Sequence, residues 1–282
     1  MFTRLLVALL LVLLANAGIQ AASGAAPGQA PAAAQPTVAV SDPNAVALAS
    51  RALQSLAGGT ALNDITLQGS ATYIAGSDEE TGTATLVARG NAQSVVTLNL
   101  TGGQRQEVRN GVAGVWVGSD GTPHAMATHN CWTDANWFFP GLSLQALAND
   151  PQVSISYVGL ETLDGTALHH LRLSRTVLGQ TPQMTTDIQR LSAFDLYLDP
   201  RTLLPLVAEF NAHPDDDFNL TIPVEIQFAD YRPVNGVRVP FRIRKLLQGT
   251  LTLDLTVANA AVNSGVPPTL FSISAVPTGG AQ

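Results

Sequence analysis

Residues 220–257 read LTIPVEIQFADYRPVNGVRVPFRIRKLLQGTLTLDLTV, and this stretch decides the fold. Apolar and polar side chains alternate along it in three runs, at 222–228, 237–243 and 251–257. A period of two is typical of a strand with one buried face. Asn235-Gly236 and Gln248-Gly249 separate the runs, and Asn-Gly suits a tight hairpin turn because both positions tolerate positive φ. The stretch therefore predicts three consecutive antiparallel strands with one apolar face.

The same alternation recurs upstream in short runs that turn signals such as Asn110-Gly111 and Asp164-Gly165 separate. Strands at spacings of roughly 8–12 residues indicate an antiparallel meander. We expect strands at 65–74, 81–89, 93–100, 104–109, 112–117, 153–160, 167–174, 188–198 and 204–212. Together with the three C-terminal runs, the alternation signals predict about eleven to twelve strands.

Helical signals are few. Asp42-Pro43 is typical of a helix start, apolar residues follow at helical spacing, and Gly58-Gly59 ends the pattern. A short helix is expected at 142–148, just after an aromatic cluster, and a polar loop at 177–185.

The N-terminus has the pattern of a secretory signal peptide. Arg4 precedes an apolar run at 5–14, and Ala15-Asn16-Ala17 provides a small-x-small cleavage pattern. We expect cleavage after residue 17, or as late as residue 22. The run is shorter than the roughly 20 residues of a transmembrane helix, and a retained anchor is the alternative interpretation.

The rest of the chain divides by composition. Residues 18–41 are rich in alanine, glycine and proline, and we expect a flexible leader there because such a segment cannot bury enough surface to fold. Residues 42–272 are expected to form one domain and residues 273–282 a flexible tail. The mature protein is expected to be exported, periplasmic, soluble and monomeric.

Charge and cysteine content exclude further classes. The formal net charge of -7 argues against nucleic acid and anionic lipid surfaces as partners, since both select basic patches. A single cysteine, Cys131, cannot form an internal disulfide and is interpreted as a buried small hydrophobe.

Several motifs in the C-terminal third mark turns and strand ends. They are DLYLDP at 195–200, LLPL at 203–206, FADYR at 228–232, NGV at 235–237, Pro240, Pro268 and Phe271. This set resembles the LolA-like superfamily of periplasmic lipoprotein carriers, over roughly residues 45–271.

The resemblance implies a mainly β fold. It would be a bent antiparallel sheet forming an incomplete half-barrel of about eleven strands, covered by one N-terminal helix and a short helix and loop lid. It also implies an apolar cavity that receives an acyl chain or another lipid. In the soluble carrier of the family an arginine inside the cavity helps close the lid, and the sequence shows no equivalent by position. The lipidated acceptor of the family needs a cysteine that this chain lacks.

The apolar strand faces and the aromatic cluster are the candidate cavity wall, and a packed core is the alternative interpretation. The candidates are Trp132, Trp137, Phe138, Phe139, Val224, Ile226, Phe228, Val239, Phe241, Ile243, Leu253 and Leu255. Two short helices are too few to cover so many strands, and uncovered apolar surface marks an interaction site.

Arg238, Arg242 and Arg244 share the face opposite Phe241. We interpret them as a solvated outer face that pairs with acids such as Glu225, and a docking patch for an acidic partner is the alternative.

Catalysis and metal binding have little support. His124, His129 and Cys131 lack the paired ligand spacing of a zinc site, and His169 and His170 point to opposite faces of one strand. The sequence lacks Gly-x-Ser-x-Gly, His-Glu-x-x-His and phosphate-loop motifs. We expect no enzyme activity, no cofactor and no metal.

The sequence therefore predicts a soluble carrier that holds an acyl chain or lipoprotein lipid, with a lipid or an acylated protein or peptide as its partner. The alternative is an interaction or sensor module that binds a periplasmic or outer-membrane protein without carrying lipid. An enzyme is the third hypothesis, and it would need a converging polar cluster.

Overall fold

The computed structural model describes residues 39–273. The expected signal peptide, the leader up to residue 38 and the tail from residue 274 lie outside the described residues. No helix in the described part is long and apolar enough to cross a membrane.

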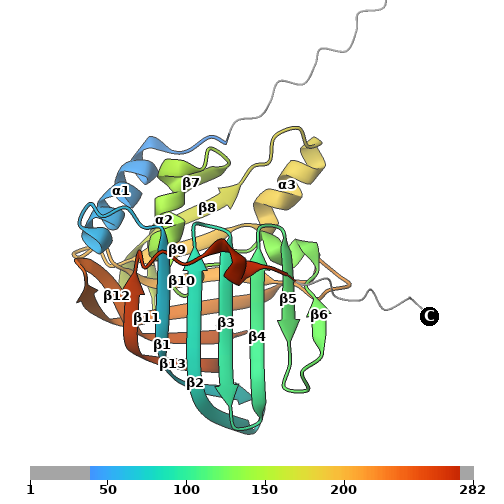
Figure 1. The fold of residues 1–282 in the computed structure, drawn as a ribbon. Coiled ribbons are helices and arrows are strands. Elements are labelled where there is room, and N and C mark those ends of the chain that lie inside the picture. Colours follow the sequence, from blue (N-terminus) through green and yellow to red (C-terminus); the bar gives the residue numbers. More distant parts are fainter. Residues whose placement is uncertain (1–38, 274–282) are drawn as a thin grey trace, which may run out of the picture. The chain divides into compact units, whose positions relative to one another are not determined.

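The described chain folds around one antiparallel sheet of thirteen strands (Figure 1). The strands are β1 (Asp64–Ala75), β2 (Asp78–Arg89), β3 (Gln93–Leu100), β4 (Gly103–Asn110), β5 (Ala113–Val117), β6 (Pro123–Ala125), β7 (Val153–Leu163), β8 (Thr166–Arg175), β9 (Phe194–Leu198), β10 (Pro205–Ala212), β11 (Ile222–Val234), β12 (Val237–Leu247) and β13 (Thr250–Val262). Their order is β6-β5-β4-β3-β2-β1-β13-β12-β11-β10-β9-β8-β7, so β6 and β7 are free edges and the sheet is not closed. The prediction of a mainly β, incomplete antiparallel barrel is confirmed.

The three-strand stretch at 220–257 forms β11, β12 and β13 as predicted. Asn235 and Gly236 both have positive φ, 50° and 84°, and so do Gln248 and Gly249, at 50° and 76°. Each pair thus makes the tight turn that its sequence indicated, and the turns fix the register of the three strands.

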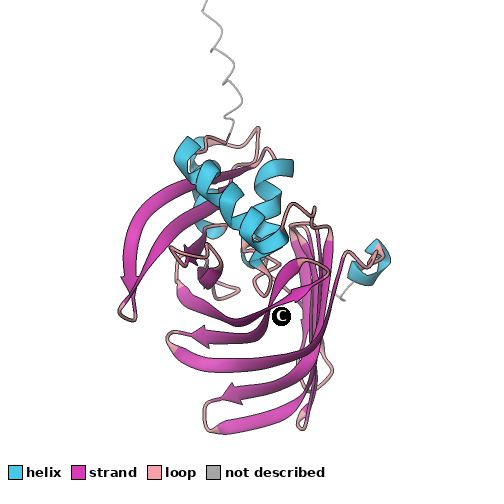
Figure 2. Ribbon diagram, turned by 90° about the vertical axis from the view of Figure 1, so that its left-hand side faces the viewer, coloured by secondary structure: helices cyan, strands magenta, loops and turns pink. Residues whose placement is uncertain are grey.

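Helices gather at one end of the curved sheet (Figure 2). Helix α1 (Pro43–Ala57) begins where the sequence predicts, because the Asp42 side chain accepts a hydrogen bond from the Asn44 amide. Gly58, in the left-handed region at φ 60°, ends it. Helix α2 (Pro140–Asn149) packs against α1 and covers the region of the expected short helix.

The expectation of one strand over 188–198 is wrong for its first half. Pro182–Leu191 forms a third helix, α3, and only Phe194–Leu198 is strand. Thr181 caps the helix by accepting a hydrogen bond from the Met184 amide, and Pro182 occupies the first turn. This Thr-Pro start signal outweighs the alternation that follows it.

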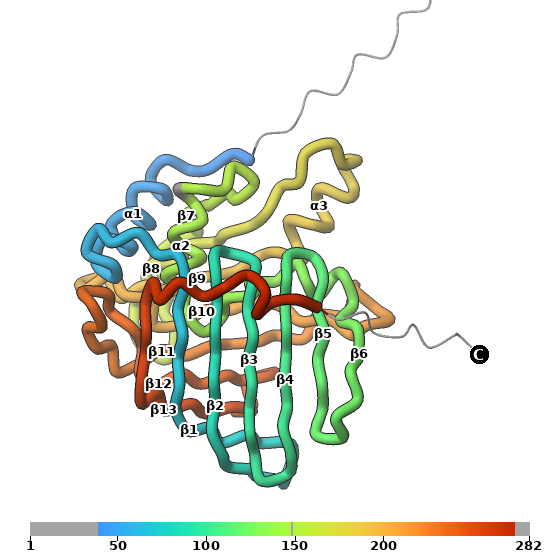
Figure 3. The backbone as a smooth tube through the Cα atoms, in the orientation of Figure 1, coloured from blue at the N-terminus to red at the C-terminus, as the bar shows by residue number. Residues whose placement is uncertain are grey.

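Two hydrophobic clusters lie on opposite faces of the sheet. The main core fills the inner face and includes Trp137, Phe138 and Phe139. On the outer face Phe271, fully buried, packs against Val87 and Val95. Figure 3 shows how the chain after β13 crosses the strands on this face, so that the short helix η2 (Pro268–Phe271) lies over β3 and β4.

Two glycines allow neighbouring backbones to approach closely where the sheet curls. A Cβ on Gly69 of β1 would lie 2.0 Å from the Thr256 carbonyl oxygen, and one on Gly82 of β2 would lie 1.9 Å from the Asn99 carbonyl oxygen. Gly69 also follows a register shift between β1 and β13, and such irregularities bend a strand. Glycine within a strand is typical of a tight bend or a close backbone approach.

We expect Gly82→Ala to lower the free energy of unfolding by about 1–3 kcal/mol, because the added methyl group must displace backbone. Thr83→Ala, one residue along and exposed, is the control and should change it by less than about 0.5 kcal/mol. Denaturant unfolding followed by circular dichroism measures both. Equal stability of the two variants would contradict the close approach at Gly82.

Candidate functional site

Two adjoining hollows open on the inner face of the sheet, with volumes of about 490 and 200 Å³. They share Glu107, Trp116, Trp137, Lys245 and Leu247, and together we call them the inner groove. The larger hollow is further lined by Tyr73, Val96, Leu98, Arg105, Gln106, Val117, Gly118, Ser119, Thr252 and Leu253. The smaller one is further lined by Arg109, Met126, Asn130, Thr133, Phe210, Ala212, Asp215 and Val224.

The curl of the sheet creates the inner groove. Glu107 on β4 and Lys245 on β12 line the same hollows, although β3, β2, β1 and β13 lie between their strands in the sheet. In a flat sheet these two strands would be about 24 Å apart, since neighbouring strands are spaced by about 4.8 Å. Only a strongly curved sheet brings the two side chains to one site.

One wall of the larger hollow carries an ion pair. Arg105 donates two hydrogen bonds to Glu80, at 2.8 and 2.7 Å, and its guanidinium lies 4.7 Å from the centre of the Tyr73 ring. The hydrogen bonds from Arg105 hold the pKa of Glu80 below its usual value. The charge of Arg105 is therefore already matched within the wall.

Lys245 lies where the two hollows meet. Its ammonium is 4.8 Å from the centre of the Trp137 ring, a cation–π contact, and the side chain is half-buried. Burial lowers the pKa of Lys245 below its usual value, although the charge of Glu107 opposes the shift. Glu107 itself lies 3.7 Å from the Arg109 guanidinium.

Arg109 ties the sheet to the segment 128–139, which we call the aromatic loop because it contains Trp132, Trp137, Phe138 and Phe139. Its guanidinium donates hydrogen bonds to the carbonyl oxygens of Asn130, Thr133 and Asp134 and to the Thr133 hydroxyl. The Arg109 side chain is only 4% exposed. One side chain thus satisfies several backbone carbonyls of a loop without regular strand pairing.

The aromatic loop is also tied to the connection between β10 and β11. Asn130 accepts a hydrogen bond from the His213 amide at 2.9 Å and donates one to the His213 carbonyl at 2.8 Å. A His129 ring nitrogen lies 2.9 Å from the Pro214 carbonyl oxygen. These polar contacts hold the loop at residues 129–130, whereas Phe138 and Phe139 at its other end are packed in the main core.

We expect Arg109→Gln to loosen the aromatic loop, because an amide cannot reach the same set of carbonyls and hydrogen bonds from charged groups contribute roughly 1.5–3 kcal/mol. Amide hydrogen exchange over 128–136 should accelerate by about tenfold or more. Arg105→Gln, on the same strand face but without a bond to the loop, is the control. Unchanged exchange in the Arg109 variant would contradict the role of this side chain.

The structure separates the predicted cavity residues into two groups. Trp137, Val224 and Leu253 line the inner groove. The members that pack within the main core without lining the groove are Phe138, Phe139, Ile226, Phe228, Val239, Phe241, Ile243 and Leu255. Trp132 is half-buried beside a small hollow of about 30 Å³. A ligand role for any of them stays a prediction.

Sequence reasoning missed the charged and aromatic members of the groove, above all Arg109, Trp116 and Lys245. Arg105, Glu107 and Arg109 alternate along β4, and a charged strand face normally indicates solvent. The alternation shows that they share a face, but only the curl of the sheet makes that face concave. Arg109 is a buried arginine that binds the aromatic loop, and the sequence did not indicate it.

The arginines of β12 lie on the outer face, as the alternation predicts. Arg242 and Arg244 both form ion pairs with Asp254 of β13 rather than with Glu225. The Arg244 Nε lies 3.4 Å from a carboxylate oxygen of Asp254. Arg238 is exposed. A partner patch at Arg238, Arg242 and Arg244 stays a prediction.

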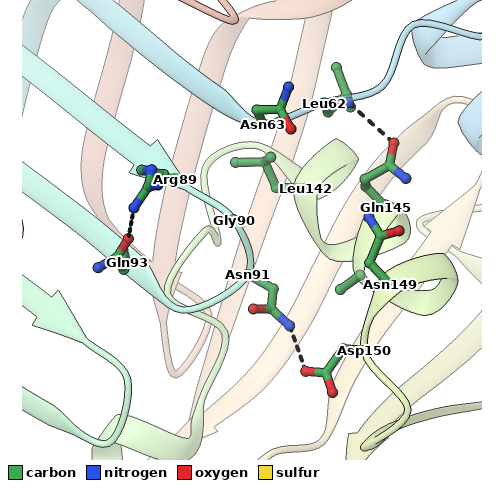
Figure 4. Close-up of a pocket in the computed structure, with 11 residues that line it drawn as sticks. Leu62, Asn63, Arg89, Gly90, Asn91, Gln93, Leu142, Gln145, Asn149 and Asp150 are labelled. Carbon is green, nitrogen blue, oxygen red and sulfur yellow. Dashed lines mark hydrogen bonds between the residues drawn. The ribbon is translucent and has the colours of Figure 1, made fainter. Parts of the chain in front are cut away.

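A second pocket, of about 440 Å³, has a different chemistry (Figure 4). It lies beside α2, and carboxamides dominate its wall: Asn63, Asn91, Gln93, Gln145 and Asn149. Some are already engaged, as Asn91 is with Asp150 at 2.8 Å. Such a polar wall does not suit an acyl chain.

His169 and His170 do point to opposite faces of β8. A nitrogen of His169 lies 3.1 Å from the Tyr157 hydroxyl, whereas buried His170 lies 2.7 Å from an oxygen of Asp195 and 3.1 Å from one of Glu161. Burial disfavours the imidazolium of His170, but its carboxylate partners outweigh this and its pKa is raised. At Asp195, burial is outweighed by the hydrogen bond with His170 and by two hydrogen bonds from Arg172, so the pKa of Asp195 is lowered.

We expect His170→Gln to destabilise the protein more at pH 5.5 than at pH 8.5. A raised pKa in the folded state means that the charged ring stabilises the fold fully below its unfolded pKa of about 6.5, and that this contribution disappears as pH rises through the folded value. Urea unfolding at both pH values measures it, with His169→Gln as the control. An equal loss at both pH values would contradict the charged pair.

Comparisons with known proteins support the fold. Neither family models nor curated proteins match the chain. Among solved structures, a LolA superfamily protein from Nitrosomonas europaea is similar with a TM-score of 0.50 at 13% identity, over 83% of this chain and 99% of that one. A putative outer membrane lipoprotein-sorting protein domain from Vibrio parahaemolyticus gives a TM-score of 0.48 at 12% identity, over 80% and 95%.

The fold is therefore LolA-like, as the motifs of the C-terminal third predicted. At 13% identity the likeness concerns the fold and not the activity.

Proposed function

We propose that the protein is an exported, periplasmic carrier or binding protein that holds a lipid acyl chain in the inner groove. The observation that carries this proposal is the larger hollow of the groove. It has a volume of about 490 Å³, lies inside a LolA-like sheet, and has Val96, Leu98 and Leu253 in its wall. Ligand pockets of roughly 300–1,000 Å³ that are mostly apolar with a few polar groups are typical of small-molecule sites.

The aromatic loop is the cover of this groove in our proposal. Trp137, which it contributes, lines both hollows. Arg109 holds the 130–134 part of the loop by hydrogen bonds, whereas Phe138 and Phe139 at its other end are packed in the main core. In our proposal the 130–134 part moves to admit an acyl chain, while Phe138 and Phe139 stay in place. Burial of the chain would supply about 25 cal/mol per Å² of apolar surface.

The alternative, an interaction module, has support from one edge of the sheet. Strand β7 is a free edge, and Tyr157, Val158 and Leu160 on it are 37%, 45% and 58% exposed. Exposed edge strands pair readily with another chain. A protein partner at β7 would be compatible with an empty or a filled groove.

Native mass spectrometry of the protein, purified without detergent and incubated with an acylated peptide or phospholipid, tests the carrier. We expect an adduct in the lipid mass range that is lost on denaturation. An unchanged mass after both incubations would count against a carrier and in favour of the interaction module.

We expect Leu98→Trp to reduce adduct formation at least about tenfold, because an indole in place of the Leu98 side chain fills the larger hollow. Asn99→Trp places the same group on the exposed outer face of β3 and is the matched control. Thermal unfolding verifies that both variants fold. Full binding by a folded Leu98→Trp variant would contradict the groove as the acyl site.

A further inference from the structure

The cations that line the inner groove differ in how they are paired. Arg105 pairs with Glu80, and Arg109 lies next to Glu107 and binds the aromatic loop. Within residues 39–273, Lys245 makes neither an ion pair with a carboxylate nor a hydrogen bond from its ammonium. Lys245, at the junction of the two hollows, is therefore the cation of the described groove without a carboxylate at ion-pair distance, although Asp215 also lines the smaller hollow.

This charge lies in an environment that penalises it. A half-buried ammonium loses part of its hydration, and a buried charge is costly unless it is paired and hydrogen-bonded. The contact with the face of the Trp137 ring compensates only in part for the lost hydration, because the ring offers the ammonium no hydrogen-bond acceptor atom. The three donors of the ammonium thus face a groove in which no carboxylate of the described residues lies within hydrogen-bond distance, although the charge of Glu107 acts on the ammonium from further away.

Apolar residues line both hollows that meet at this charge, but the hollows differ in volume, about 490 against 200 Å³. Val96, Leu98 and Leu253 line the larger hollow with Lys245. The smaller hollow also carries Asp215. Lys245 attracts an anion to the junction, and Asp215 repels it from the smaller hollow. The chain attached to the anion fits the larger hollow, because that hollow has more than twice the volume of the smaller one.

We propose that the inner groove selects amphiphiles with an anionic head group, a carboxylate or a phosphate, which Lys245 binds while the chain lies in the larger hollow. This inference rests on the proposed function and names its substrate class. The formal net charge of -7 disfavours adsorption to an anionic membrane surface. The binding of a single head group inside the groove depends instead on the nearest charge, because the interaction with charges more than about 10 Å away is largely screened.

Isothermal titration with four ligands of one chain length tests the proposal: dodecanoate, dodecyl phosphate, dodecanol and dodecyltrimethylammonium. We expect at least one of the two anions to bind about tenfold or more tightly than dodecanol, since charged hydrogen bonds are the strong ones. Preference for dodecyl phosphate assigns phospholipid-like head groups, and preference for dodecanoate assigns fatty acids.

Lys245→Gln should lose this advantage and bind the preferred anion no better than dodecanol, whose affinity stays unchanged. Lys245→Arg should retain it. Arg244→Gln, one residue earlier on the outer face, is the matched control and should bind as the unaltered protein does. Lys245→Met, which removes the charge and keeps an unbranched side chain, replaces the glutamine variant if that variant fails to fold.

The two proposals fail in different ways. Equal affinities of the unaltered protein for dodecanol and for both anions would overturn the anionic head group and leave the acyl carrier standing. The same holds if Lys245→Gln binds the anions undiminished. No binding of any of the four ligands would overturn the carrier, and the head-group assignment with it.

Discussion

The close approach of backbones at Gly69 and Gly82 is the constraint on which the inner groove depends. Side chains at either position would meet a carbonyl oxygen of the neighbouring strand at about 2 Å, far inside contact distance. With only hydrogen there, β1 and β2 can curl with their neighbours. The curl of the sheet brings β4 opposite β12. Glu107 and Lys245 therefore line one hollow, although four other strands lie between β4 and β12 in the sheet.

On the inner face of this curved sheet, one region is packed core and another lines the groove. Helices α1 and α2 and the aromatic loop contribute to the main core, where Phe138 and Phe139 are fully buried. Where that cover ends, charged residues appear on the same face as the apolar ones. Arg109 joins the two regions, because it projects from the sheet and satisfies the carbonyls of the loop.

This arrangement explains why apolar alternation alone does not show which residues line the groove. Of the twelve predicted cavity residues, most are packed core, and the groove adds Tyr73, Arg105 and Lys245, which no apolar pattern indicates. Lys245 follows Arg244 directly, and in the sequence both look like members of one basic run. One faces the groove and the other pairs with Asp254 outside.

The sequence by itself determined most strands and turns, the start and end of α1, and the likeness to LolA-like proteins, because alternation, Asn-Gly turns and helix caps are local signals. It did not determine α3, whose Thr181-Pro182 start competes with an alternating pattern. Only the tertiary structure decided which charged faces are concave. The reason is that the curvature of the sheet accumulates over several strands. A residue of β4 and one of β12 therefore line the same hollow, although they are far apart in the sequence.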